Sequence, residues 1–136
     1  MTAISHHAAL IYVMVVVSAS DGNMSEAELR TIGHIVRNLP VFRGFDENRL
    51  LGVSQECAAI LQERDGLDAV LGLIKDAVPE HLRETAYWLA VEVALVDSHV
   101  MLEEIRIVEL LRRCLGIDRL TAAALDRAAE ARYRSA

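Results

Sequence analysis

Four acidic residues recur at one spacing in two places along the chain, and together they could bind a metal ion. Asp21 precedes Glu28 by seven residues, and Asp97 precedes Glu104 by the same interval. Carboxylate oxygens are the ligands that the hard divalent cations Ca²⁺, Mg²⁺ and Mn²⁺ prefer. One such pair supplies too few oxygens for Ca²⁺, so backbone carbonyls, water or the other pair would have to complete its shell.

Helix-end roles are the alternative for these acids. Asp21 begins an Asp-Gly turn, and Ser25 lies three residues before Glu28, the arrangement of a capping box. In the second copy Ser98 replaces the turn glycine, and Met101, which cannot cap a helix, replaces the serine. Because the acids recur and the capping serine does not, the pattern favours a functional role.

Other chemistry is poorly represented. His99, close to Asp97, could add a Zn²⁺ ligand, but the chain has no HExxH sequence and no Cys/His cluster. The spacing of the acids also does not fit an EF-hand loop. Cys57 and Cys114 lie in apolar helical patterns and are expected to be reduced core residues. Without a phosphate-binding glycine loop or a nucleophile motif, the sequence predicts a protein that is not an enzyme.

The elements that position these acids are predicted to be helices. Apolar residues recur at helical spacing, and prolines, Asp-Gly pairs, Gly116 and Asp118 mark helix ends. The predicted fold is all-α, a compact bundle of about seven helices in a single domain over residues 1–136. The helices are expected at about residues 5–20, 25–39, 46–64, 67–78, 80–96, 100–115 and 118–134.

An internal repeat relates the two acidic pairs. When the chain is shifted by about 76 residues, residues 11–39 align with 87–115 and share roughly seven identities. This predicts two helix–loop–helix units, at about residues 5–64 and 80–134, joined by a linking helix at 67–78. Corresponding apolar positions such as Leu29 and Ile105 are expected to face the core.

Composition and charge exclude several classes. The chain has 136 residues, of which 53% are hydrophobic, so it suits one folded domain and is not disordered. Its net charge is −6, and residues 46–104 hold thirteen acids against four bases, which argues against nucleic-acid binding. The apolar run at 8–19 is too short to cross a membrane and lacks the basic start of a signal peptide. A cytoplasmic protein is predicted.

The two acidic loops with their flanking helices, at about 18–29 and 94–105, resemble the TerB-like family of tellurite-resistance-associated proteins. The same module is similar to the N-terminal region of DjlA-type co-chaperones. The resemblance implies an all-helical domain of duplicated origin, a bacterial cytoplasmic home and a link to tellurite or general stress resistance. It also implies a divalent metal ion held by Asp21, Glu28, Asp97 and Glu104. Ser98 departs from the family pattern, which predicts that the second site is weakened or lost.

A second function is compatible with the same sequence. The chain could be a protein–protein interaction module, an adaptor or co-chaperone-like domain that binds no metal. Its acidic middle segment would then contact a basic protein partner. Self-association to a homo-oligomer fits either function, because alanine-rich helices such as 121–131 can pack closely.

Overall fold

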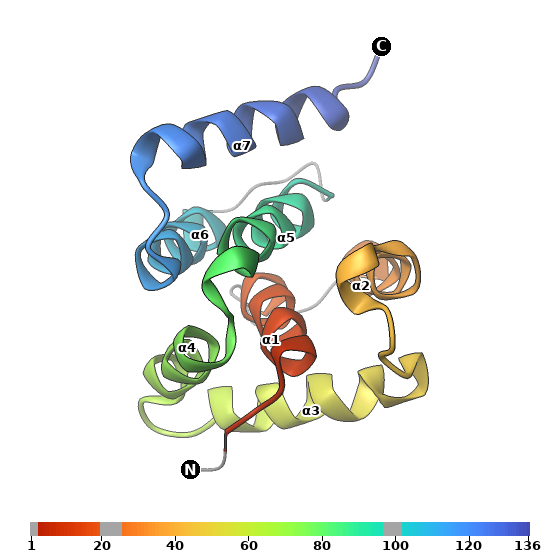
Figure 1. Ribbon diagram of the computed structural model, residues 1–136, viewed down its shortest axis with the longest axis vertical. Helices are drawn as coiled ribbons and strands as arrows, with labels where there is room; N and C mark the ends of the chain where they lie inside the picture. Colours follow the sequence, from red (N-terminus) through yellow and green to blue (C-terminus); the bar gives the residue numbers. More distant parts are fainter. Residues whose placement is uncertain (1–2, 20–25, 97–101) are drawn as a thin grey trace.

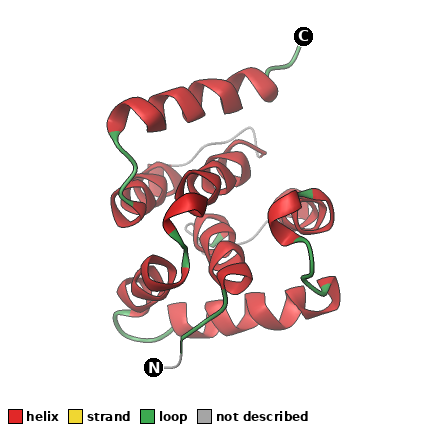
Figure 2. Ribbon diagram, in the orientation of Figure 1, coloured by secondary structure: helices red, strands yellow, loops and turns green. Residues whose placement is uncertain are grey.

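The computed structural model describes residues 3–19, 26–96 and 102–136, and these residues form seven α-helices and no strand. Figure 2 shows that helices make up most of this part of the chain, which confirms the all-α prediction. The helices are α1 (His6–Ser18), α2 (Glu26–Asn38), α3 (Leu50–Leu61), α4 (Gly66–Ala77), α5 (Arg83–Val96), α6 (Leu102–Leu115) and α7 (Arg119–Arg132). Three short 3₁₀ turns lie in the connections: η1 (Pro40–Phe42) and η2 (Glu47–Arg49) between α2 and α3, and η3 (Glu80–Leu82) between α4 and α5.

Helix α1 lies at the centre of the fold (Figure 1). Every residue from Ala9 to Ser18 is buried, because the helix is apolar on all its faces and packs against α3, α4, α5 and α6. Within the described residues, none of the helices is both long and apolar enough to cross a membrane. Because its residues are buried in the folded domain, the N-terminal apolar run is a core helix.

Helix α5 is the second central helix. It packs against α1, α6 and α7 and also contacts α2. Helix α3 thus packs on one central helix, α1, and α7 packs on the other, α5 (Figure 1). In terms of the predicted repeat, α1 with α3 corresponds to α5 with α7. However, α5 packs along α6 far more extensively than α1 packs along α2. The duplication therefore remains a prediction from the sequence.

The segment predicted as one helix at 46–64 is shorter and is preceded by a 3₁₀ turn. Asp46 caps that turn by accepting a hydrogen bond from the N–H of Asn48 at 3.0 Å. Helix α3 then ends at Leu61, three residues early. A tight turn follows, in which a Cβ on Gly66 would lie 2.0 Å from the carbonyl oxygen of Ile60. Only glycine fits there, so the helix cannot continue to 64.

The two cysteines differ in their surroundings. Cys57 is fully buried, as predicted, and burial raises the pKa of its thiol to about 12. Cys114 is only half-buried, and its thiol donates a hydrogen bond to the carbonyl of Leu71 at 3.2 Å. Both cysteines are free. Neither has the lowered thiol pKa of a reactive cysteine.

Candidate metal-binding acids and a third buried glutamate

Glu28 is buried near the start of α2, where only 3% of its surface is exposed. Its position follows from the helical period, because Glu28, Ile32 and Ile35 are spaced four and three residues apart and share one face. Ile32 and Ile35 are core residues, so the same face carries Glu28 into the interior. By contrast, Glu26 lies two residues earlier and its side chain is 91% exposed.

Glu104 occupies the corresponding place in α6 and is equally buried, with 3% exposed. Here the face continues through Val108 to Leu111, which is fully buried. The two glutamates thus occupy matching positions in the first turns of two helices, each directly after one of the acidic loops.

The residues next to these glutamates do not face the core, and this part of the prediction is wrong. Leu29 is 52% exposed and Ile105 is 54% exposed. Each lies one residue after a buried glutamate, and one residue turns a helix by about 100°. The buried face of each helix therefore includes the carboxylate and leaves the neighbouring apolar side chain outside.

A buried carboxylate needs compensation, because removing a charge from water is costly. The first turn of a helix supplies part of it through its partial positive charge. A bound cation would add to this compensation. The arrangement therefore fits a hard divalent cation, since the donors are carboxylate oxygens held away from bulk water.

The structure describes two of the four predicted metal ligands, Glu28 and Glu104. Asp21, Asp97 and the additional candidate His99 lie outside the described residues, as does Ser25 with its predicted cap. Among the residues that are described, no three His, Cys, Asp or Glu side chains group in a way that could hold a metal ion. Glu28 and Glu104 therefore form no such group with the other described acids.

A third buried glutamate, Glu92 in α5, was missed in the sequence. It is 5% exposed, and its Oε1 accepts a hydrogen bond from the Tyr133 hydroxyl and lies 3.5 Å from Nε of Arg132. Its Oε2 has no hydrogen-bond partner within the described residues. The sequence did contain a cue, because Glu92 is the one charged residue in the apolar run 86–96.

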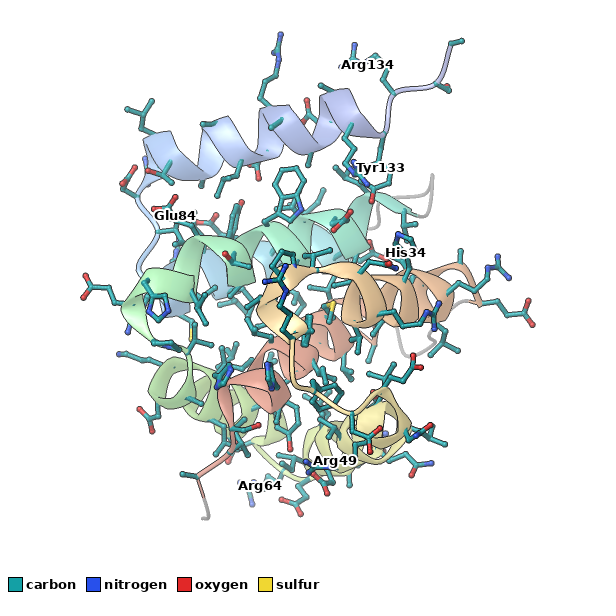
Figure 3. All side chains as sticks on the ribbon, turned by 45° about the vertical axis from the view of Figure 1, so that its right-hand side comes forward. His34, Arg49, Arg64, Glu84, Tyr133 and Arg134 are labelled. Atoms are coloured by element: carbon teal, nitrogen blue, oxygen red, sulfur yellow. The ribbon has the colours of Figure 1, made fainter. Side chains whose placement is uncertain are left out.

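Glu92 lies at a surface cavity of about 340 Å³ between α2, α5 and the end of α7. Arg30 and His34 of α2 line it together with Arg132 and Tyr133. Figure 3 shows His34 and Tyr133 on the same side of the molecule. Because two arginines line this cavity, their positive charges disfavour the binding of a metal ion there. Glu92 is therefore a structural acid that ties the C-terminal end of α7 to the core.

The fold and these acids define an all-helical domain with buried carboxylates at two helix starts. The chain belongs to the family described as tellurite resistance protein TerB, whose sequence model matches residues 7–128. This confirms the resemblance seen in the two acidic loops and makes the chain a domain of a tellurite-resistance-associated family. No curated protein and no solved structure matches the chain.

Proposed function

We propose that this TerB-family protein binds a divalent cation through Asp21, Glu28, Asp97 and Glu104. The observation that carries the proposal is the burial of Glu28 and Glu104 at matching positions of α2 and α6. Burying a charged carboxylate costs free energy, because the group loses its contact with water. Their burial directly after the two acidic loops in the sequence supports the proposal of a cation site.

The donor set indicates which cations to test first. Carboxylates favour Ca²⁺, Mg²⁺ or Mn²⁺, and His99 would allow Zn²⁺ to compete. A bound cation would reduce the repulsion between the loop acid and the helix-start acid of each pair. It would also stabilise the folded state by mass action, since the unfolded chain holds no such site.

The proposed role is non-enzymatic, cytoplasmic and part of bacterial tellurite or stress resistance. Family membership supports the link to tellurite resistance. The role also includes a protein partner, which the excess of acids over residues 46–104 suggests should be basic.

Thermal unfolding of the chelator-stripped protein tests the metal site directly. We expect one of Ca²⁺, Mg²⁺, Mn²⁺ or Zn²⁺ to raise the Tm by several degrees, because a ligand at about a hundred times its Kd adds ~2.7 kcal/mol of stability. Asp21→Asn and Glu28→Gln should each reduce this shift, as should Asp97→Asn and Glu104→Gln in the second copy. Glu26→Gln is the matched control and should retain the full shift.

Calorimetric titration of the same variants separates binding from changes in stability. If no cation binds, or if binding is equal in the wild type and all four site variants, the acids have helix-end roles only. The family assignment would be unaffected by that result.

A further inference from the structure

A groove of about 320 Å³ lies between α5, α6 and α7. Its floor is apolar and comes from α5, with Val91, Ala94 and Leu95. One wall is α6, which contributes Ile105 and Val108. Helix α7, which packs on α5 (Figure 1), forms the other wall with Asp126 and Glu130.

The apolar wall of the groove is open to solvent. Ile105 is 54% exposed, and Leu95 and Val108 are half-buried. A large aliphatic residue in this position gains free energy when a second apolar surface covers it. The groove therefore has the apolar centre that a docking site needs.

Every charged residue that the structure places in the lining of this groove is acidic. Glu104 and Glu109 come from α6, and Asp126 and Glu130 come from α7. Asp126 and Glu130 are four residues apart, so both lie on the face of α7 that borders the groove. The groove thus has an apolar floor and an acidic rim.

Two of these acids, Glu109 and Asp126, are held in place by hydrogen bonds. Arg112 donates two hydrogen bonds to Glu109, at 2.7 and 3.0 Å, and holds the pKa of that carboxyl at about 2. The Tyr87 hydroxyl donates to Asp126 at 2.7 Å. Glu130 forms no ion pair with any described residue. Because Arg112 offsets the charge of Glu109, the attraction of the groove for a basic side chain rests chiefly on the two acids of α7.

We propose that this groove binds an amphipathic, basic helical segment of a protein partner. An apolar side chain of that segment would lie against Ile105 and the α5 floor, and its Lys or Arg side chains would contact Asp126 and Glu130. Helices dock in this way by placing side chains spaced three and four residues apart into a groove. The acidic rim disfavours nucleic acid and other polyanions. The inference gives a chemistry to the partner in the proposed function and does not depend on metal binding.

A labelled peptide tests the proposal. The probe is an amphipathic helix of about 18 residues with two leucines four apart, flanked by lysines and arginines. Fluorescence anisotropy is measured in chelator, so that failure of the metal site cannot affect the result. We expect binding that weakens as salt is added. Versions of the peptide with serine for leucine, or glutamate for the basic residues, should not bind.

Two variants of the protein locate the binding site. We expect Ile105→Ser and Glu130→Lys each to weaken binding about tenfold or more, a loss of at least about 1.4 kcal/mol. Leu120→Ser and Glu26→Lys are matched controls on exposed positions outside the groove and should bind as the wild type does. Both groove positions are at the surface, and circular dichroism checks that the variants fold.

Three results would overturn the proposal. The first is no binding of the basic peptide, and the second is equal binding by the groove and control variants. The third is a dimer in analytical ultracentrifugation that Ile105→Ser abolishes, because the occupant would then be a second copy of this chain.

Discussion

Glu92 and Tyr133 illustrate how single residues support a buried charge in this fold. The carboxylate lies within α5, and its hydrogen-bond partner comes from just beyond the end of α7, 41 residues later in the chain. Burial raises the pKa of the Tyr133 hydroxyl, and its bond to Glu92 raises it further. The hydroxyl therefore stays protonated and donates at neutral pH.

Removing this hydroxyl should destabilise the protein. We expect Tyr133→Phe to lower the free energy of unfolding by about 1–3 kcal/mol, because a buried carboxylate loses its donor while the ring remains. Urea denaturation measures the loss. The control is the same change in a Glu92→Met background, where both partners are apolar and the loss should nearly vanish. An equal loss in both backgrounds would assign the effect to packing alone.

Single residues were predictable from the sequence only where the cue was local. The acids at helix starts could be found because they recur, and Cys57 because it lies in an apolar pattern. The pairing of Glu92 with Tyr133 depends on how α7 lies on α5, which no local pattern contains. The exposure of Leu29 and Ile105 was missed for a related reason, since helical spacing alone does not show which edge of the apolar face is buried.

The three-residue connection between α6 and α7 contains both the C-terminal cap of α6 and the N-terminal cap of α7. Gly116 has a φ of +70°, its N–H donates to Arg113, and the N–H of Ile117 donates to Arg112, which is the hydrogen-bond pattern of a Schellman cap. Asp118 then starts α7 by accepting from the N–H of Thr121 at 2.8 Å. Both caps were predicted from the sequence, since glycine and aspartate in this order have few other structural uses.

Two glycine substitutions should have opposite effects. Gly116→Ala should lower the free energy of unfolding by about 1–2 kcal/mol, because alanine is strained in the left-handed region. Gly52→Ala lies inside α3, where an added Cβ meets nothing within 4 Å, and should raise it by about 0.5–1 kcal/mol. Chemical denaturation of both variants measures the difference. A stabilised Gly116→Ala would contradict the role of this cap.

Most helices were predictable because turns and caps are local, and the deviations fall where tertiary packing acts. Helix α3 stops at Leu61 because the chain must turn tightly at Gly66 against the carbonyl of Ile60. The predicted helix at 80–96 opens with the 3₁₀ turn Glu80–Leu82 before α5 begins. Neither change alters which residues face the core.

At the scale of the whole molecule, the arrangement of helices around α1 was not predictable from the sequence. The sequence showed that α1 is apolar on all faces and must be covered, but not by which helices. The structure covers it with α3, α4, α5 and α6, and α4 also contacts α3 and α6. Helix α4 thus contacts helices of both predicted units.

This central position makes α1 the element on which the stability of the whole domain depends most. We expect Leu10→Ala, at a fully buried position, to lower the free energy of unfolding by about 2–5 kcal/mol through lost apolar contacts and the cavity left behind. Leu120→Ala is the matched control, because Leu120 is 82% exposed on α7, and its effect should stay within about 0.5 kcal/mol. Urea denaturation followed by circular dichroism measures both. Because four helices share the α1 surface, the Leu10→Ala protein should still unfold in one transition at a lower urea concentration. Separate transitions, or equal losses in the two variants, would show that α1 is not the common core of these helices.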